Sequence, residues 1–239
     1  MADDGQSYYR RVLEELPGEG CPACREIDDG VDEYLRRTLY GRITDRRFRA
    51  AFDAAGGFCR RHARRLASFS DGLAISLLYE NPLREALRRP SLGERIRAKL
   101  ESLKPGSRSF RGFAVSGNCP ACDREAELLG HYLSIVRRYW HETTLRVAYE
   151  NSGGLCLPHY RELTRRRKPP AWMEEFQQKK VARLDGAVQR FVEYANAARA
   201  GSRPNLSREE QLIWKELLTF LYGDRILPEA ETPPDRDGW

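Results

Sequence analysis

Two copies of one cysteine and histidine pattern constrain this chain more than any other feature. The motif Cys21-Pro22-Ala23-Cys24 recurs as Cys119-Pro120-Ala121-Cys122, and Cys59-Arg60-Arg61-His62 recurs as Cys156-Leu157-Pro158-His159. All six cysteines of the 239-residue chain lie in these four motifs. Because the order and spacing of the motifs are also kept, we interpret the sequence as an internal duplication.

The residues between the motifs have a helical pattern. Apolar side chains recur at steps of three and four, and no segment shows the alternation that is typical of a strand. In the first copy, Thr44 or Asp45 is expected to cap a second helix, which the pair at 56–57 ends. Each copy is therefore predicted to run out along one helix and back along another, so that its own two motifs meet. The apolar positions are Ile27, Val31, Tyr34, Leu35 and Leu39 in the first copy, and Leu129, Tyr132, Leu133, Val136 and Trp140 in the second.

An all-α fold with two repeated units follows from this pattern. The first Cys3His helical repeat is expected over residues 1–103, and the second, with added C-terminal helices, over residues 104–239. A Gly- and Ser-rich stretch at 104–118 is the expected connection. Capping boxes at 91–94 and 207–210 predict two further helix starts, and Pro169-Pro170 precedes a long amphipathic helix.

Three cysteines and one histidine in each copy provide the four ligands that structural zinc prefers. We expect two Zn²⁺ per chain, with an iron–sulfur cluster as the alternative, since thiolates also hold such clusters. Disulfides are disfavoured because they would not explain the paired histidines. The expected ligand sets follow the copies: Cys21, Cys24, Cys59 and His62 in the first, and Cys119, Cys122, Cys156 and His159 in the second.

The remaining polar residues give weaker signals. His131 and His141 have no counterpart in the first copy, so we interpret them as residues of a helix surface. Basic clusters near residues 46–49, 60–65 and 165–168 are interleaved with acidic residues, which favours a solvated face over a nucleic-acid site. No phosphate-binding loop, nucleophile elbow or His-Glu-x-x-His motif is present. We therefore assign no catalytic residues, and an enzyme is not the favoured interpretation.

The composition limits the classes of protein to which the chain can belong. Hydrophobic residues make up 41% of the chain, which is enough for a core, and the net charge is +6. No apolar run approaches the roughly 20 residues that cross a bilayer, and residues 1–7 do not resemble a signal peptide. The expected location is the cytoplasm, without a membrane partner.

The doubled Cys-Pro-x-Cys and Gly-x-Cys-x-x-His motifs, together with a Trp-containing C-terminal helix at 213–218, resemble a bacterial family of unknown function. The resemblance covers essentially the whole chain. It implies the same architecture and the eight metal ligands, but it implies no activity.

Three functional hypotheses remain at this stage. The leading one is a non-enzymatic zinc protein that acts as an interaction or adaptor module with a protein partner. The second is a redox or electron-transfer protein with iron–sulfur clusters or a thiol switch. The third is a regulator that binds nucleic acid through its basic clusters.

Overall fold

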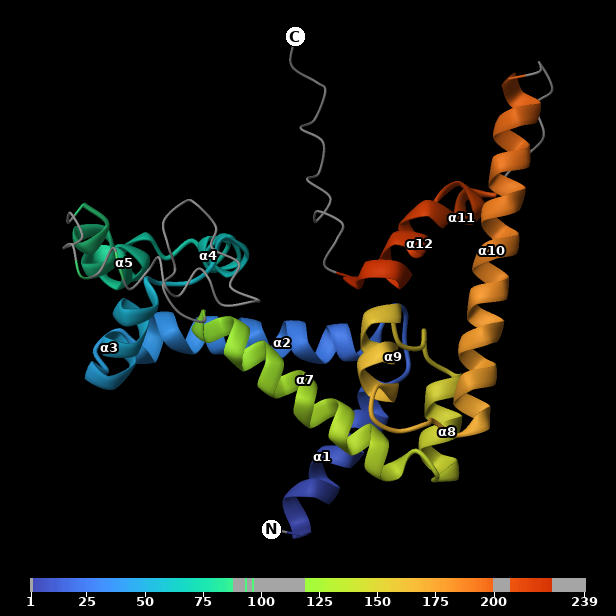
Figure 1. The fold of residues 1–239 in the computed structure, drawn as a ribbon, viewed down its shortest axis with the longest axis horizontal. Helices are drawn as coiled ribbons and strands as arrows, with labels where there is room; N and C mark the ends of the chain where they lie inside the picture. The colour runs from blue at the N-terminus through green and yellow to red at the C-terminus, as the bar shows by residue number, and fades with distance from the viewer. Residues whose placement is uncertain (1, 88–92, 94–95, 97–118, 200–206, 225–239) are drawn as a thin grey trace. The chain divides into compact units, whose positions relative to one another are not determined.

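The computed structural model describes residues 2–87, 93, 96, 119–199 and 207–224, and its regular elements in these ranges are helices (Figure 1). An isolated bridge between Gly18 and Ser152 is the one β-type pairing among the described residues. The predicted all-α fold is confirmed. The helices are α1 (Ala2–Glu15), α2 (Pro22–Arg37), the π-helix η1 (Thr38–Arg42), α3 (Arg46–Ala55), α4 (Arg60–Ala67), α5 (Gly72–Leu87), α7 (Pro120–Tyr139), α8 (Thr143–Glu150), α9 (Leu157–Thr164), α10 (Ala171–Arg199), α11 (Arg208–Gln211) and α12 (Ile213–Tyr222).

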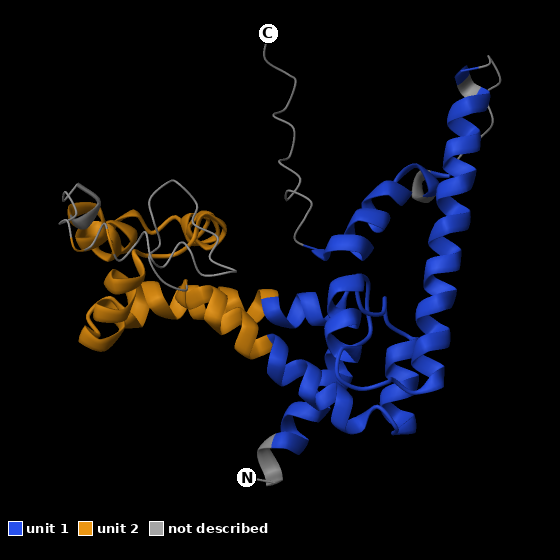
Figure 2. Cartoon of the chain, in the orientation of Figure 1, with its two compact units in different colours: residues 1–27, 129–239 blue, residues 28–128 orange. Residues whose placement is uncertain are grey.

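The chain forms two compact units (Figure 2). Unit 1 combines Met1–Ile27 with Leu129–Trp239, and unit 2 is Asp28–Leu128. The boundaries fall inside α2 and α7. The compact units are thus not the same as the sequence ranges 1–103 and 104–239, because unit 1 joins the start of the first repeat to most of the second.

Local sequence signals fix several helix ends. The Asp45 carboxylate caps α3 by accepting hydrogen bonds from the backbone N–H groups of Arg47 (2.8 Å) and Phe48 (3.3 Å). Gly56 ends the same helix with a left-handed φ of 75°. The Ser207 box is also present, since Ser207 and Glu210 exchange hydrogen bonds of 3.0 and 3.2 Å. The predicted cap of α3 at Asp45, its end at 56–57 and the capping box at 207–210 are therefore confirmed.

The core of unit 1 lies where α1 packs on α7 and α8. Trp140, Leu145 and Tyr149 are almost fully buried there. Tyr9 of α1 stacks on Tyr139 with ring centroids 4.0 Å apart, and Trp172 of α10 donates a hydrogen bond to the carbonyl oxygen of Trp140. Burial of these large side chains holds the helices that position the unit 1 cysteines.

Unit 2 has an aromatic core centred on Phe52 of α3. This ring is fully buried and meets the edges of Phe58 (5.0 Å) and Tyr79 (5.3 Å). Gly57, with φ 96°, lies so close to Tyr79 that a Cβ would come within 2.8 Å of its ring. The pair at 56–57 therefore ends α3 and also lets the chain turn under Tyr79 toward Cys59.

The structure differs from the sequence interpretation in three helices. α1 and α5 were not anticipated, and α5 continues through Pro82. The single helix expected after Ser207 is divided at Leu212 into α11 and α12. The helix and connection expected between 91 and 118 lie outside the described residues, except for residues 93 and 96, and so does the tail expected to be irregular after Gly223, except for Asp224. None of the described helices is long and apolar enough to cross a membrane.

Candidate metal centres

The eight predicted ligands form two groups, but each group takes its members from both repeats. Site A consists of Cys21, Cys24, Cys156 and His159, and site B consists of Cys59, His62, Cys119 and Cys122. Site A lies in unit 1 and site B in unit 2. The expectation that each repeat closes its own site, with Cys59 and His62 beside Cys21 and Cys24, is therefore wrong.

Helix lengths give the physical reason for the exchange. α2 has 16 residues and is about 24 Å long, whereas the returning α3 has 10 residues and is about 15 Å long. The same holds in the second repeat, where α7 has 20 residues and α8 only 8. The returning helix does not span the length of the outgoing one, so each Cys-x-x-His motif meets the Cys-Pro-x-Cys motif of the other repeat.

Each site is built where two helices begin. Cys59 and Cys156 are the N-cap residues of α4 and α9, and Cys21 and Cys119 directly precede Pro22 and Pro120, the first residues of α2 and α7. The second ligand of every motif is the third residue of its helix, which places it one turn from the first ligand. Four helix N-termini, two at each site, thus direct backbone N–H groups toward the sulfur atoms, where they stabilise negative charge.

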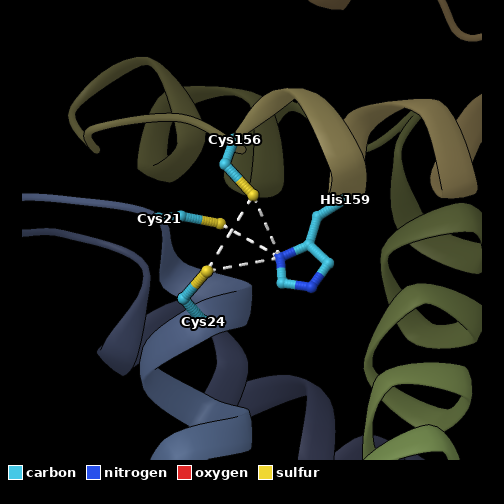
Figure 3. Close-up of side chains that lie close together, drawn as sticks. All are labelled: Cys21, Cys24, Cys156 and His159. Carbon is cyan, nitrogen blue, oxygen red and sulfur yellow. Dashed lines mark hydrogen bonds between the residues drawn. The ribbon is translucent and has the colours of Figure 1, made fainter. Parts of the chain in front are cut away.

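In site A the donor atoms converge on one point (Figure 3). The Nδ1 atom of His159 faces the three sulfurs and lies 3.5 Å from Cys21 Sγ, 3.5 Å from Cys24 Sγ and 3.3 Å from Cys156 Sγ. Cys24 Sγ and Cys156 Sγ are 3.9 Å apart. All four donors come within 4.8 Å of one another.

Site B repeats this geometry with the same kinds of donor atom. His62 Nδ1 lies 3.4 Å from Cys59 Sγ, 3.5 Å from Cys119 Sγ and 3.4 Å from Cys122 Sγ. Cys59 Sγ and Cys122 Sγ are 3.7 Å apart. The two sites therefore present matching Cys3His sets through Nδ1.

These separations fit a single tetrahedral ion. With Zn–S bonds near 2.3 Å and Zn–N bonds near 2.0–2.1 Å, tetrahedral ligands stand about 3.8 Å apart for two sulfurs and about 3.5 Å apart for sulfur and nitrogen. The S–S distances of 3.9 and 3.7 Å and all six distances from sulfur to Nδ1 match these values within about 0.2 Å. No described cysteine is in a disulfide. The residues present can thus hold two metal ions.

A family model for a family of unknown function, DUF6062, matches residues 12–194. The chain belongs to DUF6062. The match includes all eight ligands and ends within α10, before α11 and α12. Curated proteins and solved structures gave no match to the chain. The predicted resemblance to a family of unknown function is confirmed.

In this DUF6062 chain, the protonation of site A shows why the site suits a cation. Burial raises the pKa of Cys21, but hydrogen bonds with Cys156, Cys24 and His159 lower it well below its ordinary value. Burial opposes a charge on His159, yet its hydrogen bonds to Cys156 and Cys21 raise its pKa to about 10. The cluster therefore holds thiolate beside a proton, and a metal ion would replace that proton with a stronger positive charge.

Site B has the same need for positive charge. Burial and the charges of Cys119 and Cys59 raise the pKa of Cys122 to about 12. Burial also raises the pKa of Cys119, whereas backbone N–H groups at the start of α4 lower that of Cys59 in spite of burial. Three thiolates this close repel one another unless a cation lies between them.

Residues outside the predicted ligands support the sites. The Glu125 carboxylate lies 3.6 Å from His62 Nε2 and also pairs with Arg61, an arrangement that orients a ligating imidazole. At site A, the Asp224 carboxylate accepts a hydrogen bond from the Cys21 N–H (3.1 Å), and Lys180 donates to the Gly153 carbonyl oxygen. Glu125 follows Cys122 by one helical turn, so its spacing could have identified it. Asp224 is 203 residues from Cys21, and no local pattern indicates it.

The other candidates have structural roles. His131 lies on the exposed surface of α7, as predicted, and stacks on Tyr8 at 4.1 Å, whereas His141 is exposed in the turn after α7 and not on a helix. In the basic run at 60–65, Arg61 pairs with Glu125 and Arg65 pairs with two aspartates of α2. These internal ion pairs reduce the positive charge that the cluster offers to a partner.

Proposed function

We propose that this chain is a non-enzymatic zinc protein whose two ions act as structural staples, and that the stapled fold serves as a module for binding another protein. The observation that carries this proposal is the crossed pairing of the ligands. Cys24 and Cys156 are 132 residues apart, and Cys59 and Cys122 are 63 residues apart. An ion at each site would close a long loop and remove much of the freedom of the unfolded chain.

The donor geometry supports zinc over an iron–sulfur cluster. The four ligands of an iron–sulfur cluster are divided among two or four irons, so they do not all lie as close together as the four donors here, which come within 4.8 Å of one another. Four protein donors also leave no open position for a bound water, which is the arrangement of structural zinc sites. We accordingly propose closed, structural Zn²⁺ centres.

Exposed apolar side chains support the binding of a protein partner. Trp214 and Tyr222 of α12 expose 44% and 62% of their surface, and Val192 of α10 exposes 51%. Aromatic residues are enriched in the contact regions of protein complexes. We propose the cytoplasm as the location, because a reducing compartment keeps the six cysteines available as metal ligands.

Metal analysis with a visible absorption spectrum tests this proposal directly. The full chain should be purified without oxygen and without added metal, and its zinc, iron and sulfide should be measured per chain. We expect two zinc ions and no visible absorption. Iron with sulfide and a coloured spectrum would replace the staple hypothesis with a redox protein, and no metal at all would overturn the assignment of both sites.

The protein partner needs a separate test. Trp214→Ala and Tyr222→Ala, made together, should leave the zinc content unchanged while weakening capture of a partner from a cell extract. As a control, duplex DNA and single-stranded RNA should be titrated at low salt. Salt-sensitive binding to nucleic acid, with no partner protein captured, would contradict the module hypothesis.

A further inference from the structure

The two sites differ in which ligands face the solvent. In site A, Cys21, Cys24 and Cys156 are only 2%, 5% and 1% exposed, and the partly exposed ligand is His159. In site B the order is reversed. His62 and Cys119 are 1% and 5% exposed, whereas Cys59 and Cys122 are partly exposed. Site A thus presents an imidazole to solvent, and site B presents two sulfurs.

The C-terminal helix explains the burial of site A. The chain leaves α12 through Gly223, which lies so close to the cluster that a Cβ there would be 3.3 Å from Cys24 Sγ and 3.9 Å from Cys156 Sγ. Asp224 then accepts the hydrogen bond from the Cys21 N–H. This covering segment follows the part of the chain that the family model matches.

The described residues around site B leave Cys59 and Cys122 partly exposed. Among the described residues, the ion pair of Arg61 with Glu125 lies on the His62 side of the site. Arg61 pairs with Glu125, which lies one helical turn after Cys122 on α7, so a cation lies near one of the partly exposed sulfurs. Thiolates in partly exposed, electropositive surroundings are the ones that react with oxidants.

The two exposed sulfurs are also close enough to join. Cys59 Sγ and Cys122 Sγ are 3.7 Å apart, and a disulfide requires about 2.05 Å. The motion needed is therefore about 1.7 Å, which rotation of two side chains at helix N-termini can supply. In site A the comparable pair, Cys24 and Cys156, is buried, so an oxidant does not reach it.

We propose that site B is an oxidation-sensitive site, at which hydrogen peroxide or a related two-electron oxidant converts Cys59 and Cys122 to a disulfide and releases the metal, while site A keeps its ion. This inference rests on the proposed function, because it requires zinc at both sites.

The chemistry balances with one molecule of peroxide. One zinc-bound thiolate attacks a peroxide oxygen, the O–O bond breaks, and a sulfenic acid forms as hydroxide leaves. The second thiolate attacks the sulfenic sulfur, forms the S–S bond and expels a second hydroxide. The two sulfurs lose two electrons, the peroxide gains them, and two protons from solvent convert both hydroxides to water. Only His62 and Cys119 would then remain as ligands of the site, which is too few to retain the ion.

Contacts on α4 allow this exchange to be reversible. Arg65 binds the Asp28 carboxylate at 2.6 Å and the Asp28 carbonyl oxygen at 2.9 Å, so α4 stays attached to α2 without the metal. The new disulfide also keeps α4 attached to α7. A thiol reductant and added zinc should therefore restore the reduced site.

The test is zinc release from the full chain under a limiting dose of hydrogen peroxide, followed with a chromogenic zinc chelator. The protein should first be shown to contain two zinc ions. We expect one zinc per chain to be released at least tenfold faster than the other, and peptide mapping should find a Cys59–Cys122 disulfide. Release of both ions at equal rates, release of neither, or a disulfide that involves Cys21, Cys24 or Cys156 would overturn the inference.

Matched single variants assign the released ion. Cys24→Ser should lose the site A ion and still release its remaining zinc with peroxide, whereas Cys59→Ser should keep the site A ion and release none. If either variant fails to fold, peptide mapping of the wild-type chain decides the question without it. A wild-type chain that contains no zinc contradicts the proposed function itself, and that outcome is separate from two zinc ions that both resist peroxide.

Discussion

Paired cysteine substitutions test the crossed pairing, because the two possible pairings give opposite zinc counts. Cys24→Ser with Cys156→Ser removes two ligands from site A alone, so one zinc per chain should remain. Cys24→Ser with Cys59→Ser removes one ligand from each site, so no zinc should remain. If each repeat closed its own site, the first double variant would hold no zinc and the second would hold one.

The loop lengths give the size of the accompanying loss in stability. In the chain-entropy model of a cross-link, closing 132 residues stabilises the fold by about 5 kcal/mol, and closing 63 residues by about 4 kcal/mol. These values are comparable with the whole stability of a typical domain, about 5–15 kcal/mol. Adding Cys156→Ser to Cys24→Ser should cost less than about 1 kcal/mol more, since site A is already lost. Adding Cys59→Ser should cost about 4 kcal/mol more.

The assay combines metal analysis with unfolding in urea. Both double variants share Cys24→Ser and carry two Cys-to-Ser changes, so each serves as the control for the other. Reversed zinc counts would refute the crossed pairing. Equal losses of stability in the two double variants would refute the argument that the sites act as separate staples, even if the zinc counts agreed.

Two further predictions concern the surroundings of site A. Gly153→Ala should lower the free energy of unfolding by about 1–3 kcal/mol, because its Cβ would meet the backbone carbonyl oxygen of Gly20. The control variant Gly130→Ala, which lies in open space on α7, should instead raise the free energy of unfolding by up to about 1 kcal/mol. Urea unfolding that gives the two variants the same stability would contradict the close approach of Gly153 to Gly20. Although burial opposes its charge, hydrogen bonds and the charge of Arg11 hold the pKa of Glu26 below its ordinary value. The carboxylate therefore stabilises the fold above its unfolded-state pKa near 4.3, and this contribution is lost as the pH falls through the lower folded-state value. Between pH 6 and about 3 the wild-type chain should lose more stability than Glu26→Gln, and parallel pH curves would contradict this account.

Local sequence signals predicted much of the secondary structure correctly. Asp45 and Gly56 define α3, and Ser207 with Glu210 opens α11, because capping depends on residues within a few positions of each other. α5 was missed because Pro82 lies within it and its apolar residues do not form a simple stripe. The break at Leu212 was also missed, since the apolar pattern runs through it without interruption.

The supporting groups around the sites depend on distance along the chain. Glu125 lies one helical turn after Cys122, so its place beside the site could be predicted from the spacing of the two residues. Asp224 and Lys180 come close to site A only because α10 and α12 pack near α9, and nothing local to Cys21 indicates them.

By itself, the sequence identified the eight residues of the two candidate metal sites and predicted that the chain is helical. Four motifs with two-residue gaps place two donors on the first turn of a helix wherever that helix lies, so the eight ligands could be named without a structure. Which motifs share an ion was decided by the tertiary structure. Both Cys-x-x-His motifs have the chemistry to complete either Cys-Pro-x-Cys pair, and one-dimensional spacing does not distinguish them. The long outgoing helices and short returning helices do, because they carry each motif to the opposite repeat and bury three sulfurs at one site while exposing two at the other.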